Sequence, residues 1–495
     1  MSRNLNKGIT VKYNKMIPLS EIPLLAEGDF RNAVLELTQE GWRCNAFFSM
    51  INKGSGSRLM MILSDDHQGV SRALCLKVEN NTFRSLSTED EQFHLFEREI
   101  YEQSGIMPGG HPWLKPVRFP RGQVESMDFF RMEGPDVHQV AVGPVHAGII
   151  EPGHFRFQCH GETVYHLETS HGFQHRGIEK AIAAGPAKNT LLKIGVTAGD
   201  STIAHTMAYC QIFETFTETR ISARAEAIRA IALELERCAN HIGDLGALSG
   251  DVGYLPTASY CGRIRGEFLN MSALLCGNRF GRNLVCPGGT SMDIDDGIKT
   301  ELLKRLDAGK KDFLNAAALL WDSPSVLARF DATGTVSGET ANRIGMVGPA
   351  ARASGCQRDI RKDHPSGYYH LSFIPVSTAE RGDVNSRAYV RWLEVQESIK
   401  FIEKLLKELP EGETLKTINK SLAPDSLAIS FIEGWRGEVC HAAVTESSGR
   451  FKQYKIVDPS FHNWLGLSLA LRGEEISDFP VCNKSFNLSY CGFDL

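Results

Sequence analysis

The sequence predicts an α+β protein, with a small N-terminal α/β domain at residues 1–125 and a mainly α-helical bundle domain with peripheral β-strands at residues 126–495. A chain of 495 residues is too long for one ordinary core, so more than one domain is expected. Short apolar runs typical of strands occur in the first part, whereas long segments with helical periodicity dominate the second. These two patterns together indicate the α+β class.

Composition indicates a globular, soluble chain. Hydrophobic residues make up 42% and charged residues 23%, and the net charge is -5, which gives no electrostatic basis for binding nucleic acid. No apolar run approaches the roughly 20 residues of a membrane span. The N-terminus lacks the apolar segment of a signal peptide. We therefore expect a cytoplasmic protein that reaches a membrane only through partner subunits.

The cysteines argue against a cofactor that this chain binds by itself. Twelve cysteines are present, all as singletons, and no C-x-x-C pair occurs. Zinc ribbons and locally encoded iron–sulfur sites use such pairs, so neither is expected. Most of these thiols are interpreted as small core residues of a reducing compartment.

The first 125 residues contain the elements of a small sheet domain. An amphipathic segment at residues 22–41 precedes strand-like runs at residues 44–52 and 59–65. Asn80 and Asn81 are expected to form a turn between two further strands. No catalytic constellation is apparent in this part.

A charged helix with a defined end closes this region. Glu97, Arg98 and Glu99 are expected to give the helix a charged face, and Gly105 is expected to end it, before the turn GGHP. The segment FEREIYEQSGIMPGGHPWLKPV resembles the signature of the 30-kDa subunit of respiratory complex I. That resemblance implies a docking domain without a redox centre.

Three histidine-bearing segments follow between residues 143 and 205, bounded by Gly or Pro. They contain His171, His175 and His205. Glycine permits close approach of backbone to a ligand, and a polar loop backed by apolar helices is a usual form of a buried site. Satisfied core histidines are the alternative interpretation.

A long helix is expected over SARAEAIRAIALELERCANHIGDLGAL. Glu234, Arg237 and His241 lie on its other faces at spacings that allow pairing, with His241 either on the surface or buried. The apolar residues at spacings of 3 and 4, which predict one core face, are Ile228, Ile231, Leu235, Cys238, Ile242 and Leu245.

The next segments alternate turns and helices. Pro287-Gly288-Gly289 predicts a turn, and Asp293 is expected to cap the following helix. A later long helix ends at Pro410 and carries a Glu397–Lys400 pair. The glycine-rich loop between these helices carries charges that form either a solvated face or a site: Arg352, Arg358, Asp359 and Arg361.

Several segments in order resemble the 49-kDa subunit of complex I, whose relatives are the large subunits of membrane-bound [NiFe] hydrogenases. They are GETV, HGFQHRGIEK, FIEGWRGEVCHAAV and VDPSFHN. Fusion with a 30-kDa-like part resembles the large subunit of formate hydrogenlyase-type complexes or a fused C/D subunit of a complex I relative. The resemblance implies three kinds of partner: a small iron–sulfur subunit with a [4Fe-4S] cluster, a ferredoxin-like iron–sulfur subunit, and integral membrane subunits.

The nickel ligands of the hydrogenase relatives are missing. In that family four cysteines in two pairs bind the metals, and soft thiolates suit nickel and iron. Aligned to that pattern, the ligand positions are occupied by Ala198, Ser201, Ser489 and Gly492. An atypical nickel site would have only the lone Cys482 and Cys491 to draw on. We expect no metal and no other cofactor bound by this chain itself.

The quinone ligands of the complex I relatives are also replaced. The resemblance puts Ile150 at the position of the histidine and Gly199 at that of the tyrosine that hold the quinone headgroup. The residues that could substitute for them are His146, Asp200, His171 and Tyr209.

Three polar residues persist at family positions. Arg436 matches the arginine above the metal pocket, where a guanidinium could hold an anionic or carbonyl ligand. Glu151 matches a proton-relay glutamate, for which a raised pKa is expected, and His205 could pass a proton onward. Together with Asp200 these are the candidate catalytic residues, although satisfied buried pairs are an equally open interpretation.

These features lead to three functional hypotheses. The first is an electron-transfer subunit that carries electrons from a partner [4Fe-4S] cluster to quinone or another acceptor, with coupled proton transfer, at the inner face of the cell membrane. The second is a non-catalytic scaffold with a degenerate site. The third is an atypical [NiFe] hydrogenase.

Overall fold

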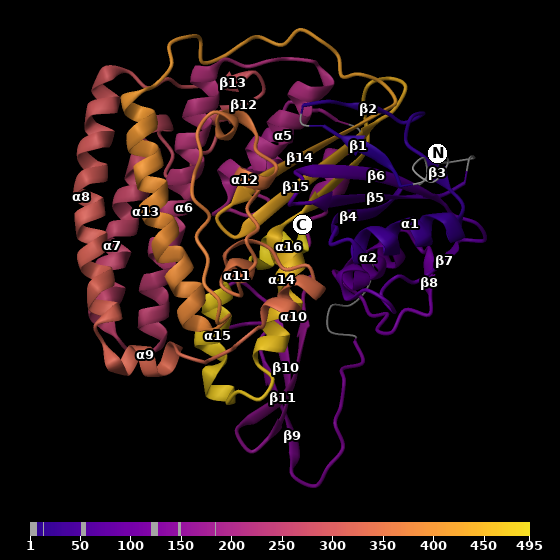
Figure 1. The fold of residues 1–495 in the computed structure, drawn as a ribbon, viewed down its shortest axis with the longest axis horizontal. Helices are drawn as coiled ribbons and strands as arrows, with labels where there is room; N and C mark the ends of the chain where they lie inside the picture. Colours follow the sequence, from indigo (N-terminus) through magenta and orange to yellow (C-terminus); the bar gives the residue numbers. More distant parts are fainter. Residues whose placement is uncertain (1–6, 13, 51–55, 120–126, 147–149, 184) are drawn as a thin grey trace.

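The computed structural model describes residues 7–12, 14–50, 56–119, 127–146, 150–183 and 185–495. A helical bundle lies on one side and an N-terminal sheet on the other, with a second sheet between them (Figure 1). A three-stranded sheet extends away from this body at the bottom of the view in Figure 1.

The N-terminal sheet has the order β1-β6-β5-β4, all antiparallel, with β3 parallel to β6. Its apolar strands are almost fully buried because α1 and α2 pack against it. The elements are β1 (Ile9–Val11), β3 (Leu24–Leu25), α1 (Glu27–Gln39), β4 (Arg43–Met50), β5 (Arg58–Asp65), β6 (Val70–Lys77) and α2 (His94–Ser104).

Four long helices form the bundle: α6 (Ala223–Asp251), α7 (Leu255–Cys276), α8 (Asp296–Trp321) and α13 (Val384–Lys407). The apolar face predicted for α6 is confirmed, because all six of its residues are fully buried. Ser222 caps α6 by accepting a hydrogen bond from the backbone N–H of Ala225 at 3.0 Å. The prediction that Asp293 caps α8 is wrong: Asp295 does so, while Asp293 pairs with Arg224 at 2.7 Å.

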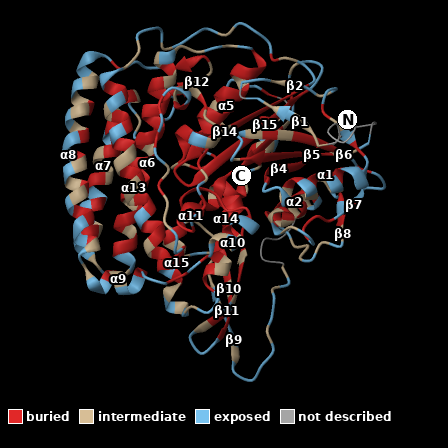
Figure 2. Cartoon of the chain, viewed as in Figure 1, coloured by how far each residue is buried: buried red, intermediate tan, exposed pale blue. Residues whose placement is uncertain are grey.

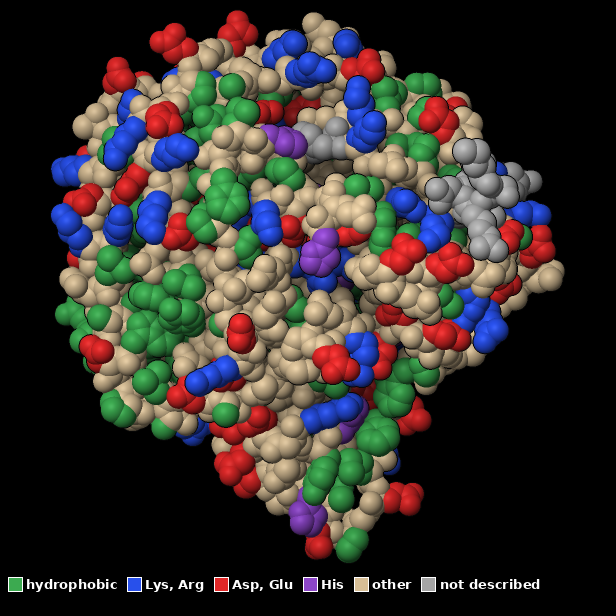
Figure 3. Space-filling view, in the orientation of Figure 1, with side chains coloured by type: hydrophobic (Ala, Val, Ile, Leu, Met, Phe, Trp, Pro, Cys, Tyr) green, Lys and Arg blue, Asp and Glu red, His purple; other side chains and the backbone are tan. Residues whose placement is uncertain are grey.

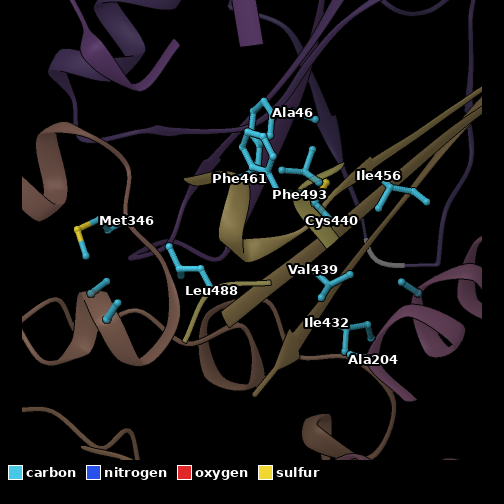
Figure 4. Close-up of a cluster of buried hydrophobic side chains, with 14 of the residues drawn as sticks. Ala46, Ala204, Met346, Ile432, Val439, Cys440, Ile456, Phe461, Leu488 and Phe493 are labelled. Carbon is cyan, nitrogen blue, oxygen red and sulfur yellow. The ribbon is translucent and has the colours of Figure 1, made fainter. Parts of the chain in front are cut away.

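The central sheet has the order β16-β15-β14-β2, so an N-terminal strand completes a sheet that the C-terminal part builds. Helix α5 packs on β14 and β15. Figure 4 shows side chains of β4, α5, β14, β15, β16, α14 and α16 meeting in one buried cluster. The bounds are β2 (Ile17–Pro18), α5 (Thr202–Phe216), β14 (Ser426–Gly434), β15 (Gly437–Thr445), β16 (Phe451–Val457), α14 (Pro459–Ala470) and α16 (Tyr490–Asp494).

The remaining elements connect these layers. Strands β9 (Val137–Val142), β10 (His154–His160) and β11 (Thr163–Ser170) make the extending sheet. The others are β7 (Thr82–Arg84), β8 (Met107–Gly109), α3 (Ile178–Ile182), α4 (Thr190–Ile194), β12 (Val285–Cys286), β13 (Gly289–Thr290), α9 (Pro324–Phe330), α10 (Gly338–Arg343), α11 (Gly348–Arg352), α12 (Ile360–Asp363) and α15 (Phe479–Phe486).

Several charged residues that could have formed solvated faces are buried, whereas Arg98 and Arg358 are only partly so. Glu97 accepts hydrogen bonds from Leu86 and Ser87, and Glu99 is bound by Arg118 and by Lys455 at 2.6 Å. Helix α2 therefore presents its acidic residues to the interior, where each has a polar partner. Arg352, Asp359 and Arg361 are buried in the same way. The helix end predicted at Gly105 is confirmed by its left-handed backbone (φ 72°).

The buried residues run continuously from the bundle through the central sheet to the N-terminal sheet (Figure 2). On the face shown in Figure 3, acidic and basic side chains are intermixed. Among the residues that the structure describes, no helix has both the length and the apolar character that crossing a bilayer requires.

Candidate functional site

Two segments that are far apart in sequence meet at Arg436, in the turn between β14 and β15. The guanidinium donates from Nε to the carbonyl of Asn487 at 2.6 Å and from Nη1 to Oγ of Ser201 at 3.3 Å. Ser201 follows Ala198 by one turn of backbone, and Asn487 directly precedes the segment with Ser489. Arg436 therefore joins the segment with Ala198 and Ser201 to the C-terminal segment with Ser489 and Gly492.

Arg436 is held by Asp200 in a two-pronged ion pair. Nη1 and Nη2 donate to the two carboxylate oxygens at 2.6 and 2.7 Å, and the guanidinium stacks over Trp435 at 3.9 Å. Burial opposes ionisation of Asp200, but Arg436 outweighs it and lowers the pKa of Asp200. The Asp200 side chain is 33% exposed and that of Arg436 is 6% exposed. Asp200 is therefore the member of the pair that a ligand from solvent meets.

The ligand positions do not fit a nickel–iron centre. A Cβ on Gly492 would lie 2.6 Å from a carboxylate oxygen of Asp458, so Asp458 occupies the space of a side chain there. Ser489 Oγ accepts the backbone N–H of Gly492 and caps α16. Ala198 has no donor atom. No group of three or more His, Cys, Asp or Glu residues placed to hold a metal occurs in the described ranges.

His205 lies beside this former ligand space, fully buried on α5. Its Nε2 is 3.2 Å from Oδ2 of Asp458, and its Nδ1 is 3.0 Å from Nε2 of His441 on β15. The other oxygen of Asp458 accepts the backbone N–H of Ser460 at 2.8 Å. His205 is therefore linked on both sides, as a relay or a buried structural pair would be.

Glu236 on α6 is a titratable group that the sequence did not single out. Its carboxylate accepts from the backbone N–H groups of Ile203 at 2.7 Å and Ala204 at 3.3 Å, in the first turn of α5. Burial raises the pKa of Glu236 to about 8, with those bonds opposing the rise and the charge of Asp200 adding to it. Glu236 therefore carries a proton at neutral pH.

Glu151 contacts the C-terminal segment. Its carboxylate accepts from the backbone N–H of Tyr490 at 3.2 Å and lies near that of Cys491. Arg176, in the HRGIEK segment, donates to the carbonyls of Thr197 at 2.7 Å and Cys491 at 3.0 Å. Arg176 therefore joins the two segments of the site, and Glu151 binds the C-terminal one.

Of the residues suggested as substitute quinone ligands, Asp200 lies at this site, whereas His146, His171 and Tyr209 do not converge on it. His146 bonds the carbonyl of Gly153 at 3.0 Å within its own loop, and Ile150 is 57% exposed. His171 packs against Trp464 with a ring separation of 4.2 Å, and buried Tyr209 lies near Tyr454. Gly199, in contrast, directly precedes Asp200, and no atom lies within 4 Å of the position its Cβ would take.

Comparison with known proteins identifies the family. The description "Respiratory-chain NADH dehydrogenase, 49 Kd subunit" matches residues 251–428. The chain is 30% identical over 352 residues to the carbon monoxide-induced hydrogenase of Rhodospirillum rubrum, a match that covers 71% of this chain and 97% of that protein. The chain belongs to the complex I 49-kDa and hydrogenase large-subunit family. The family resemblance drawn from HRGIEK and GWRGEV is thereby confirmed.

Two further relatives represent the two branches of this 49-kDa family. Formate hydrogenlyase subunit 5 of Escherichia coli is 30% identical over 424 residues, covering 80% of this chain and 74% of that protein. An NADH-quinone oxidoreductase subunit of Herpetosiphon aurantiacus is 31% identical over 359 residues, covering 71% of this chain and 96% of that protein. Membership establishes the general class, an oxidoreductase-type subunit whose relatives work with other subunits.

A solved structure confirms the fold. A chain of the membrane-bound sulfane sulfur reductase, an archaeal respiratory membrane complex, superposes with a TM-score of 0.69 at 22% identity, over 73% of this chain and 99% of that one. The predicted α+β class with a 49-kDa-type helical region is thus confirmed.

Proposed function

We propose that this 49-kDa family member transfers electrons from a [4Fe-4S] cluster of a small partner subunit to a quinone or another carbonyl-bearing acceptor. The observation that carries the proposal is the ionised Asp200–Arg436 pair beside open space at Gly199, with Glu236 holding a proton next to it. This site has polar groups for a proton-coupled reduction, and burial raises the pKa of the nearby Cys491 thiol to about 12, so that group is not a thiolate at neutral pH.

The chemistry balances without a metal in this chain. A quinone takes up two electrons from the partner's cluster, one at a time, and two protons, and becomes the quinol. Arg436 holds Asp200 in place, and the remaining role of this chain is to supply protons. Glu236 can give one, because its pKa of about 8 leaves it protonated at neutral pH.

The partners follow from the same proposal. A small iron–sulfur subunit supplies electrons, a ferredoxin-like subunit feeds it, and integral membrane subunits hold the assembly at the inner face of the cell membrane. In support, apolar side chains are exposed close in sequence to the site: Val145, Ile150, Leu192 and Val196.

Metal content with activity tests the proposal. The intact purified complex should contain iron but no stoichiometric nickel, should evolve or consume no hydrogen, and should reduce a short-chain quinone when given a low-potential donor. Stoichiometric nickel with hydrogen activity on the same sample would contradict the proposal and would establish the third hypothesis, an atypical hydrogenase.

A pH profile tests the role of Glu236. Since a carboxyl group with a pKa of about 8 is protonated below that pH and ionised above it, quinone reduction should fall by about tenfold per pH unit well above pH 8. Glu236→Gln cannot donate this proton, so its activity should be low at pH 7 and nearly independent of pH between 7 and 9. A profile of Glu236→Gln that matches the native one would exclude this role.

The scaffold hypothesis remains the second candidate, because four of the five N–H groups of Arg436 face partners within the chain. It predicts that substitutions at Asp200 and Glu236 leave turnover of the complex unchanged while the subunits still assemble. The two candidates thus differ in a single assay on assembled complexes.

A further inference from the structure

Four buried side chains form one continuous row of hydrogen bonds away from the site. Asp458 bonds His205 at 3.2 Å, His205 bonds His441 at 3.0 Å, and His441 Nδ1 lies 2.9 Å from the hydroxyl of Tyr454. All four are at most 2% exposed, and they come from α5, β15, β16 and the N-cap of α14. Every separation is within hydrogen-bonding distance.

Asp458 sets the direction of the whole row. Burial opposes its ionisation, but the bond from His205 and the charge of Arg436 outweigh burial and lower the pKa of Asp458, so this carboxylate only accepts. A neutral His205 then carries its proton on Nε2 and accepts at Nδ1.

The donor and acceptor roles of His441 and Tyr454 follow from that of His205. A neutral His441 has one N–H, which it must direct from Nε2 to Nδ1 of His205, and its own Nδ1 must accept from the Tyr454 hydroxyl. His441 is neutral because burial holds its pKa well below the ordinary value. Burial also raises the pKa of Tyr454, which keeps its hydroxyl protonated at rest. With His205 neutral, every donor in the row is directed toward Asp458.

The two ends of the row lie where a proton path needs them. At the inner end, Oδ2 of Asp458 lies 2.6 Å from where a Cβ on Gly492 would stand, and the family resemblance aligns Gly492 with a hydrogenase metal ligand. At the outer end, Tyr454 is one of the residues that line a cavity of about 570 Å³. Glu102, Glu179 and Lys180 also line that cavity, so titratable groups are available there.

We propose that Tyr454, His441, His205 and Asp458 are a proton-delivery relay from the charged cavity to the acceptor site; this inference rests on the proposed function. Tyr454 gives its hydroxyl proton to Nδ1 of His441, His441 gives its Nε2 proton to Nδ1 of His205, and His205 gives its Nε2 proton to Asp458. One proton enters from the cavity onto Tyr454 and one leaves Asp458 for the reduced acceptor. No electron moves along this row.

Quinone reduction by the intact complex tests the relay. Tyr454→Phe removes only the hydroxyl, and His441→Gly leaves a space of imidazole size; each should slow turnover by about 100-fold. Added imidazole should restore His441→Gly toward the native rate but not Tyr454→Phe. Tyr165→Phe, on an exposed tyrosine of β11, is the matched control and should be native-like.

A second readout separates proton delivery from mere packing. Oxidation of the complex by ferricyanide, which takes an electron without a proton, should proceed at native rate in both variants. The relay alone would be overturned if Tyr454→Phe reduced quinone at the native rate, or if imidazole failed to rescue His441→Gly. Slow ferricyanide reduction in both variants would overturn it as well. A native complex that reduces no quinone would overturn the proposed function, and the relay with it.

Discussion

Replacing Arg436 with alanine should lower quinone reduction by the assembled complex at least about 100-fold. The guanidinium, 6% exposed, bonds both oxygens of Asp200, so its removal leaves that carboxylate without its partner at the mouth of the site. Asp200 would then lose the interaction that lowers its pKa and would take up a proton near the acceptor. The measurement is turnover at saturating quinone, on complex whose subunit content has been verified.

Two variants test whether the loss comes from the pair. Arg436→Lys keeps the charge but cannot bond both carboxylate oxygens in one plane, so it should recover only part of the activity. Arg329→Ala breaks an ion pair with Asp478 on the surface, where the arginine side chain is 49% exposed, and should be silent. Native turnover of an assembled Arg436→Ala complex would favour the scaffold hypothesis.

Periodicity predicted the helices but not the ion pairs that join them. In α6, spacings of 3 and 4 identify the buried apolar face correctly, because helix geometry alone determines it. The same pattern places charged residues on the remaining faces, which are solvated in an isolated helix. In a bundle, those faces meet other helices, so Glu234 and Arg237 are fully buried and bonded across layers.

In the candidate site, too, the sequence identified some residues and the structure alone identified others. Family motifs located Asp200, His205 and Arg436, which the structure brings together. Asp458 and His441 lie in the VDPSFHN and GWRGEVCHAAV segments, but the motifs gave neither a role, because they reach His205 only when α5 packs on the central sheet. The sequence shows Glu236 only as an acidic residue two positions from Glu234 on the same helix. Its raised pKa results from burial in the tertiary structure, which the sequence does not reveal.

The largest effect on stability should come from Glu394 on α13. Its carboxylate is bonded by Arg352 at 2.7 Å and His241 at 2.8 Å, and Arg237 lies 3.5 Å away, all fully buried. Glu394→Ala leaves two buried guanidinium groups short of negative charge, so the free energy of unfolding should fall by about 3–5 kcal/mol. Urea unfolding of the full chain, followed by circular dichroism, measures this.

Glu397, one turn further along α13, is the matched control. It pairs with Lys400 at 2.7 Å, but the lysine side chain is 58% exposed, so Glu397→Ala should cost less than about 1 kcal/mol. Equal losses at the two positions would mean that the buried network contributes nothing beyond the helix itself.

The pH dependence of the stability difference tests whether the charge of Glu394 is what stabilises the fold. Burial opposes ionisation of Glu394, but Arg352 and His241 outweigh it and lower its pKa well below the ordinary value. Its contribution to stability is therefore complete above the pKa of the unfolded carboxyl, about 4.3, and is lost as the pH falls through the folded pKa. The stability difference between native protein and Glu394→Ala should shrink over that acidic range. A difference that stays constant down to about pH 3, well below that unfolded pKa, would show that the loss reflects packing and not charge.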